Sequence, residues 1–373
     1  MGARCAPLPR APAPRTGAAP QSRAHAGVLP AVHHVAEWVI SWFGFAPGTD
    51  DELLNEATAA ALAVVAGGSL VKVALESGRS ADGGRTLMVQ RKGNSADLVT
   101  QVDCEAEKKM REILLGAFPA YGFLGEEASS STISSESADA GAAAEAPPRP
   151  QVLERRGGQP EKPVWIVDPL DGTTNFVARI PQICTSVGLY YQGAVLVGAV
   201  HNPCTDDLYM AVRGRGAVLN GHPLKCDTVR AMEEAVVVTE FGYDRSRIGA
   251  QRMCGAVERL LRSGVRAVRM LGSGILDILY VAEGRIAAVY AGVAGEGWRP
   301  WDHAASTLIA QEAGAVVVPL RAGDAACAGP PSGLFDIFSD SILCACTAEL
   351  ATALGAIVLD ADGCRGALDE RDT

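Results

Sequence analysis

Two aspartates three residues apart directly follow an apolar run in the segment WIVDPLDGTTNF, residues 165–176. The apolar run predicts a buried strand, so both aspartates are expected at its end. Mg²⁺ prefers oxygen ligands and binds through a few carboxylates while it keeps waters for the substrate. We therefore expect this turn to offer a cation the carboxylates of Asp168 and Asp171 and the carbonyl oxygen of Leu170.

A glycine and two threonines continue the same segment and predict the first turn of a helix. The backbone N–H groups at a helix N-terminus lack partners inside the helix and attract anions such as phosphate. The N–H groups of Gly172 and Thr173 are therefore candidates for holding a phosphate group beside the cation.

Further acidic residues stand where other elements are expected to end or begin. Glu126 and Glu127 follow the apolar run YGFL, and Asp302 begins a predicted helix in RPWDHAAS. Alone, such an Asp most often caps its helix, and such glutamates are most often exposed. Together with the two aspartates of the strand end, they form a set of carboxylates that could converge on divalent cations. Hard cations rarely bind imidazole, so His303 is expected to have a structural or indirect role.

The overall charge excludes two classes of main partner. The chain has 373 residues, 48% of them hydrophobic, and a formal net charge of −10. Such an acidic chain is not expected to act mainly on nucleic acid or on an anionic membrane. The sequence contains no run of about 18 apolar residues, so no transmembrane helix is expected. An anionic substrate would require a local reversal of charge, which divalent cations supply.

The N-terminal residues 1–36 have a composition of their own. They contain four arginines and many Ala and Pro residues, and no acidic residue precedes Glu37. This is typical of an organellar transit peptide, and it equally fits a disordered extension. The segment VAEWVISWFGFA, residues 35–46, either docks on the body or belongs to the leader. The ten cysteines form no CxxC pair, which favours buried thiols and a reducing compartment: cytoplasm, plastid or mitochondrion.

The hydrophobic pattern divides the chain into an extension and two halves. Residues 1–50 are expected to be a disordered extension. Residues 51–229 predict helices followed by mainly antiparallel strands, interrupted at 128–163 by a Ser-, Ala- and Pro-rich segment that should be a disordered surface insertion. In residues 230–373 strands alternate with helices. Both halves together predict one layered α/β body.

Five segments, in order along the chain, resemble the inositol monophosphatase family of metal-dependent, lithium-sensitive phosphatases. They are ADLVTQVD (96–103), LGEE (124–127), VDPLDGTTNF (167–176), GRGAVLNG (214–221) and WDHAAS (301–306). The resemblance extends from about residue 51 to residue 357. It implies the αβαβα sandwich of the sugar-phosphatase type and, because family members are usually dimers, a homodimer.

The resemblance also implies a set of metal ligands. Glu126, Asp168 and the carbonyl oxygen of Leu170 would hold a first Mg²⁺. Asp168, Asp171 and Asp302 would hold a second. Such ions lower the pKa of a bound water and neutralise the charge of the phosphate during an in-line displacement.

Further roles follow from the same resemblance. A third, weaker ion would use Glu126 through water, with Asp103 nearby. Thr173 and Asp103 would position the attacking water, and the N–H groups of Gly172 and Thr173 would hold the phosphate. Lys92 matches the lysine that precedes the DLVT segment.

The residues expected around the alcohol half of the substrate depart from the family. Gly272 and Ser273 match the turn that contacts the inositol ring, but Gly274 replaces a usual alanine. The segment before WDHAAS is longer and glycine-rich, and Glu296 is the acidic residue available to bind the ring.

Three functions are therefore compared. The first is Mg²⁺-dependent hydrolysis of myo-inositol monophosphate, a small phosphate monoester. The second keeps this chemistry on histidinol phosphate, fructose 1,6-bisphosphate or a 3′-phosphonucleotide. The third is a non-catalytic regulatory or binding protein on the same fold, which is expected to have lost at least one metal ligand, whereas Glu126, Asp168, Asp171, Thr173 and Asp302 are all present.

Overall fold

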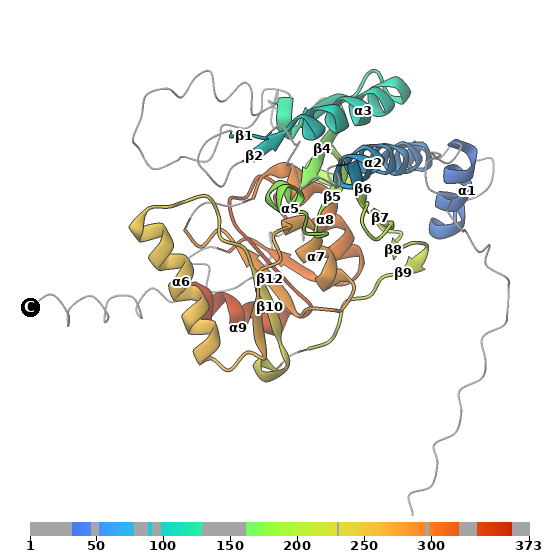
Figure 1. The fold of residues 1–373 in the computed structure, drawn as a ribbon. Helices are drawn as coiled ribbons and strands as arrows, with labels where there is room; N and C mark the ends of the chain where they lie inside the picture. The colour runs from blue at the N-terminus through green and yellow to red at the C-terminus, as the bar shows by residue number, and fades with distance from the viewer. Residues whose placement is uncertain are drawn as a thin grey trace, which may run out of the picture.

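The structure is a computed structural model of the full chain, shown in Figure 1. It describes residues 32–45, 52–77, 89–91, 98–128, 162–229, 231–294, 298–320 and 334–359.

A seven-stranded sheet contains the strand that ends in the two aspartates. The strand order is β3-β4-β5-β6-β7-β8-β9, in which β3 and β4 are parallel and the other neighbours are antiparallel. The strands are β3 (Gly122–Gly125), β4 (Val164–Asp171), β5 (Cys184–Tyr191), β6 (Ala194–Asn202), β7 (Asp207–Val212), β8 (Ala217–Leu219) and β9 (His222–Pro223). Positive φ angles at Gln192-Gly193 and Asn220-Gly221 make tight hairpin turns, for which Gly and Asn are suited.

A five-stranded mixed sheet forms the second half. Its order is β11-β10-β12-β14-β13, with β11, β10 and β12 parallel and β14 antiparallel to its two neighbours. The strands are β10 (Val236–Thr239), β11 (Ala267–Arg269), β12 (Ala288–Ala291), β13 (Val316–Val318) and β14 (Ile342–Ala345).

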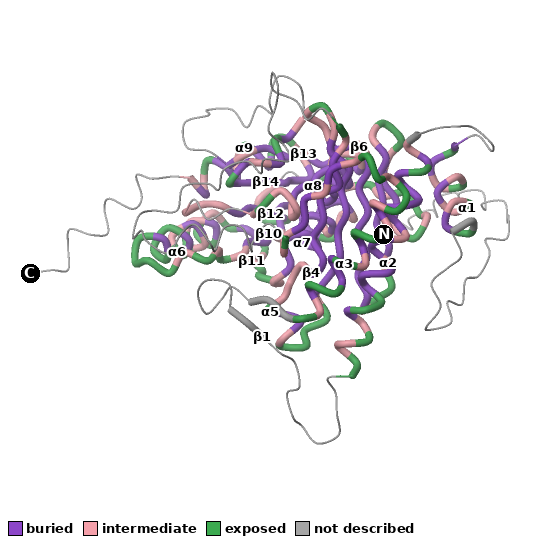
Figure 2. Tube along the Cα trace, turned by 90° about the horizontal axis from the view of Figure 1, so that it is seen from above, coloured by how far each residue is buried: buried purple, intermediate pink, exposed green. Residues whose placement is uncertain are grey.

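Helices separate and cover the two sheets. The helices α2 (Glu52–Ser77) and α3 (Gln101–Ala117) lie on one face of the seven-stranded sheet. Between the sheets lie α7 (Gly274–Ala282) and α8 (Pro300–Glu312), most of whose residues are buried and none of which is exposed (Figure 2). The outer layer is formed by α6 (Arg247–Arg262) and α9 (Ala348–Leu359). These five layers confirm the expected αβαβα sandwich.

Smaller elements complete the fold. They are α1 (Val32–Phe43), the antiparallel pair β1 (Val89–Arg91) and β2 (Leu98–Thr100), the short helix α5 (Thr173–Ala178) and the 3₁₀ turn η2 (Met232–Glu234).

The expectation of a disordered N-terminal extension is wrong for residues 32–45. These residues form α1 and the turn after it, and α1 packs against α2. Val35, Val39, Phe43 and Phe45 are buried in the same core cluster as the seven-stranded sheet. The apolar face of the segment therefore docks on the body, which was one of the two interpretations. Residues 1–31, and 129–161 of the expected insertion, lie outside the described residues.

One described helical segment, Leu53–Ser77 within α2, is long and apolar enough by composition to cross a membrane. It packs against α3 and against β5 and β6, and more than half of its apolar window is buried inside the fold. The burial between these elements accounts for its apolar sequence, as in the core helix of a globular domain.

Two glycines allow α8 to lie directly on the seven-stranded sheet. A Cβ atom at Gly188 of β5 would lie 2.6 Å from Cβ of Ala304, and one at Gly198 of β6 would lie 3.0 Å from Cα of Ala305. Since no side chain separates helix from strand here, the position of α8 is fixed by backbone contact. The N-terminal turn of α8, which contains Asp302, is fixed with it.

We predict that Gly188→Ala lowers the free energy of unfolding by about 1–3 kcal/mol, because the added methyl group overpacks a rigid contact. Gly116→Ala is the matched control, since Gly116 is an exposed residue of α3 and a Cβ atom there meets nothing within 4 Å. The control should be neutral or stabilising by up to about 1 kcal/mol. Urea unfolding of both variants is the measurement, and equal effects would contradict the close packing of α8.

Candidate metal centre

The two aspartates of β4 owe their positions to a bulge. Asp168 pairs with Ser186 of β5 and Asp171 pairs with Cys184, so three steps along β4 match two steps along β5. In a regular strand, residues three apart point to opposite faces, and one extra residue brings them to the same side. Pro169 lies inside this bulge, where it does not have to donate a ladder hydrogen bond. The bulge thus directs both carboxylates to one place.

Asp302 reaches the same place from the first turn of α8. Its carboxylate accepts a hydrogen bond from the backbone N–H of Arg299, so it caps its own helix. One ligand atom each from Asp168, Asp171 and Asp302 lies within 4.8 Å of the others. The capping role and the cluster are therefore compatible, and Asp302 has both.

Glu126 stands beside this cluster at the end of β3, where a helical turn begins. Its negative charge raises the pKa values of Asp168, Asp171 and Asp302. Since β3 is the parallel neighbour of β4, the carboxyl ends of both strands meet at one edge of the sheet. The structure therefore brings three of the four expected carboxylates within 4.8 Å of one another, and Glu126 lies near enough for its charge to act on all three.

Burial makes the repulsion within this cluster strong. The pKa of Asp168 is raised well above its usual range, first by burial and then by the charges of Glu126, Asp171 and Asp302. The pKa of Asp302 is raised in the same way, first by burial and then by Asp171. For Asp171 burial outweighs two hydrogen bonds that lower the pKa, and the value rises to about 6. Oxygen donors crowded in this manner fit a hard divalent cation, which would replace protons as the neutralising charge.

The turn before α7 holds Asp171 in place. Ser273 Oγ donates a hydrogen bond of 2.5 Å to Asp171 Oδ2, and the backbone N–H of Ile275 donates one of 3.0 Å to the same oxygen. Ser273 is fully buried and also caps α7 by accepting from the N–H of Leu276. Its hydroxyl, expected to contact substrate, thus lies against the carboxylate of Asp171. Cys184 Sγ, 3.8 Å from the same oxygen, is a contact that the sequence did not suggest.

Thr173 and Asp103 are neighbours, as their expected shared role requires. Thr173 Oγ lies 3.3 Å from Asp103 Oδ1 and 3.1 Å from the carbonyl oxygen of Leu170. Asp103 is 1% exposed and belongs to the first turn of α3. The bulged strand, α3 and α5 therefore meet at one hydroxyl group beside the carboxylates.

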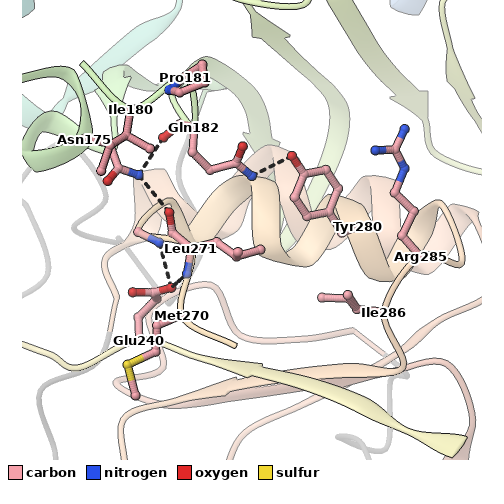
Figure 3. A pocket seen from close by; sticks show the side chains of 11 residues that line it. Asn175, Ile180, Pro181, Gln182, Glu240, Met270, Leu271, Tyr280, Arg285 and Ile286 are labelled. Atoms are coloured by element: carbon pink, nitrogen blue, oxygen red, sulfur yellow. Dashed lines mark hydrogen bonds between the residues drawn. The ribbon is translucent and has the colours of Figure 1, made fainter. Parts of the chain in front are cut away.

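Glycine is required at the two turns that flank the cluster. Gly172 and Gly272 both have φ angles of +83°, and a Cβ atom at Gly172 would lie 2.7 Å from the carbonyl oxygen of Gln182. The side chain of Asn175 joins the turns, because its Nδ2 donates to the carbonyl oxygens of Gln182 (2.9 Å) and Leu271 (2.8 Å), as Figure 3 shows. The phosphate-binding turn and the turn before α7 are thus held together as one unit.

A pocket of about 700 Å³ opens behind these turns. It is lined by residues of several elements, among them Asn175, Gln182, Glu240, Tyr280 and Arg285 (Figure 3). None of the three clustered aspartates lines this pocket. The candidate metal centre therefore lies at the carboxylates, outside the pocket. Glu240 follows the apolar strand β10, and this pattern, the same as at Glu126, could have identified it from the sequence.

Three remaining expectations have different outcomes. Lys92 and Glu296 lie outside the described residues, so their roles stay predictions. His303 is fully buried, lies 5.2 Å ring to ring from Phe335, and has its pKa lowered to about 3 by burial. A neutral imidazole packed on an aromatic ring agrees with the structural role expected for it.

Comparisons with known proteins agree with this arrangement. A model of the inositol monophosphatase family matches residues 53–372. Inositol monophosphatase 3 of Solanum lycopersicum is 36% identical over 233 residues, which cover 62% of this chain and 77% of that protein. Inositol-1-monophosphatase of Rhizobium meliloti is 36% identical over 250 residues, which cover 65% of this chain and 82% of that protein.

A solved structure has a similar fold. The extragenic suppressor protein SuhB from Bartonella henselae superposes with a TM-score of 0.62 at 27% identity, covering 80% of this chain and 96% of that one. The family match spans most of the chain and includes the segments that carry the clustered carboxylates. The chain therefore belongs to the inositol monophosphatase family, as its motifs predict.

Proposed function

We propose that the protein is a Mg²⁺-dependent phosphomonoesterase that hydrolyses myo-inositol monophosphate to inositol and phosphate. The observation that carries the proposal is the convergence of Asp168, Asp171 and Asp302 within 4.8 Å in a chain of this family. A non-catalytic protein would not need to keep mutually repelling, at least half-buried carboxylates together. Their presence supports the enzyme over the binding protein.

The proposed ligands follow the family resemblance, and the three clustered aspartates agree with it. Glu126, Asp168 and the Leu170 carbonyl oxygen would hold one Mg²⁺, and Asp168, Asp171 and Asp302 another, with a third, weaker ion near Glu126. When bound, Mg²⁺ lowers the pKa of a water molecule, neutralises phosphate charge and stabilises the leaving oxygen. Asp168 would be shared, in agreement with its central place among the carboxylates.

The chain's own groups would orient the water and the phosphate. Thr173 Oγ donates its proton toward Asp103 or the Leu170 carbonyl, so its lone pairs face outward to accept a hydrogen bond from the attacking water. The N–H groups of Gly172 and Thr173, at the start of α5, would bind phosphate oxygens. Such positioning supplies much of the catalysis in phosphoryl transfer.

The alcohol half of the substrate is the least constrained part of the proposal. Gly274 lies against Trp298: a Cβ atom at this glycine would lie 2.7 Å from the indole ring. The replacement of alanine by glycine therefore makes room for this indole, four residues before Asp302. A homodimer and a cytoplasmic or organellar location stay predictions.

The proposal is tested by phosphate release from a set of esters by the purified full chain. Inositol 1-phosphate, histidinol phosphate, fructose 1,6-bisphosphate and a 3′-phosphonucleotide are compared with Mg²⁺, with and without Li⁺. We predict Mg²⁺-dependent, Li⁺-inhibited preference for inositol 1-phosphate. Preference for another ester would keep the chemistry and replace the substrate, and no release from any ester with Mg²⁺ bound would contradict the proposal.

Asp171→Asn should reduce phosphate release by at least about 100-fold at fixed Mg²⁺, because it removes a ligand charge. The fold should survive, since an Asn side chain can still accept from Ser273 and Ile275. The control is Asp206→Asn, the same change at a largely exposed carboxylate that pairs with Lys72. Activity and circular dichroism are measured together, and full activity of Asp171→Asn would overturn the metal assignment.

Protons and Mg²⁺ should compete for the cluster. In the absence of divalent cations, the pKa of Asp171 is about 6 in the folded chain and 3.8 in the unfolded chain. Its protonation therefore stabilises the fold fully below pH 3.8, and this contribution is lost as the pH rises through about 6. Mg²⁺ binds the ionised form, so the increase in Tm that it causes should be larger at about pH 8 than at about pH 5.

The pH experiment compares the Tm of each sample with and without Mg²⁺. The titration of histidines far from the cluster affects both Tm values equally and cancels in the difference. Asp171→Asn should show a smaller Mg²⁺-dependent increase in Tm at the higher pH. An increase that is equal at both pH values in the unmodified chain would show that the raised pKa values play no part in metal binding.

A further inference from the structure

A buried carboxyl group lies behind the metal centre without any hydrogen-bond donor. Asp277, in the first turn of α7, is fully buried, and within the described part of the chain neither of its oxygens accepts a hydrogen bond. An ionised carboxylate in such a place carries a large desolvation cost, because nothing replaces the water it has lost. The helix N-terminus favours negative charge only weakly by comparison.

The group that faces Asp277 is another carboxyl, that of Glu240, within hydrogen-bonding reach. Glu240 Oε1 accepts two backbone hydrogen bonds, from the N–H groups of Leu271 (2.6 Å) and Gly272 (2.8 Å), as Figure 3 shows. Hydrogen bonds donated to a carboxylate stabilise its charged form. Of the two carboxyl groups, Glu240 has donors for one oxygen and Asp277 has none, so Asp277 is the one suited to keep a proton.

The charges around the pair agree with this division. The pKa of Asp277 is raised well above its usual range, first by burial, then by the negative charges of Glu240 and Asp171, and also by the hydrogen bond with Glu240. Tyr280, one turn further along α7, is a titratable group whose pKa depends on Asp277. Among the described residues, the charges that raise the pKa of Asp277 are both negative, and each favours the neutral acid.

The pair connects directly to the metal centre. Glu240 holds the turn that contains Leu271 and Gly272, and the next residue, Ser273, donates to Asp171. The N–H of Asp277 donates to the carbonyl oxygen of Ser273 (3.0 Å), which ties the helix to the same turn. A displacement of Glu240 would therefore move the hydroxyl group that orients Asp171.

We propose that Asp277 is a neutral carboxylic acid that donates its proton to Glu240, and that this acid–carboxylate pair positions the Leu271–Ser273 turn against Asp171. Both are positioning residues, since neither lies among the clustered carboxylates. The kinetic consequence rests on the proposed phosphatase function, whereas the protonation of Asp277 does not.

Two variants of Asp277 separate hydrogen bonding from charge. In Asp277→Asn the amide donates to Glu240 as the acid does, so kcat should stay within about twofold of the unmodified chain. In Asp277→Leu, of similar size, the donor is lost and Glu240 is left with a buried oxygen without a partner, so kcat should fall at least about tenfold with little change in KM. An Asn variant as impaired as the Leu variant, or a fully active Leu variant, would overturn the proposal.

Infrared spectroscopy detects the protonated carboxyl group of Asp277 without any substrate. With saturating Mg²⁺, which keeps the metal-binding carboxylates ionised, the full chain should show the carbonyl stretch of a protonated carboxylic acid at neutral pH. The band should vanish in Asp277→Asn. Absence of the band in the unmodified chain, or its persistence in the variant, would overturn the proposal even if the Leu variant fails to fold. Lack of phosphatase activity with the band present would count against the proposed function alone.

Discussion

Repulsion between crowded carboxylates, one buried and two half-buried, is the constraint on which the rest of the site depends. Asp168, Asp171 and Asp302 lie within 4.8 Å of one another, and Asp168 is 1% exposed. At such distances and with little water, these groups cannot all stay ionised unless a cation or protons neutralise them. The fold therefore has to hold together charges that repel one another. The elements that carry these carboxylates have to be closely packed to do so.

The layered architecture supplies that rigidity. The two central helices, α7 and α8, begin at the cluster and are clamped between the sheets, with α8 in backbone contact with β5 and β6. Ser273 transmits the position of α7 to Asp171, and the Glu240–Asp277 pair supports this turn from behind. The protonated pair adds one negative charge to a region that is already acidic, where two ionised groups would add two. The same repulsion between negative charges thus determines which carboxyl groups bind metal and which keep a proton.

The sequence predicted the local features and missed those that depend on strand register and packing. The apolar run before Asp168 and the alternation of strands and helices after residue 230 are local, and the structure confirms them. The residues alone made the convergence of Asp302 with β4 a possibility. The family resemblance turned it into an assignment, since no pattern specifies which helix start meets which strand end. The bulge in β4 could not be predicted, because it is defined by pairing with β5. The docking of residues 32–45 likewise depended on an apolar surface formed by distant residues.

The most direct test of this account is anomalous diffraction from crystals of the full chain grown with Mn²⁺, an ion of similar oxygen preference. The account predicts anomalous peaks from Mn²⁺ ions that are directly coordinated by Asp168 together with Asp171 and Asp302. The three aspartates should have the same positions as in the structure described above. Crystals at a Mn²⁺ concentration that supports full turnover, but with no peak between these carboxylates, would contradict it.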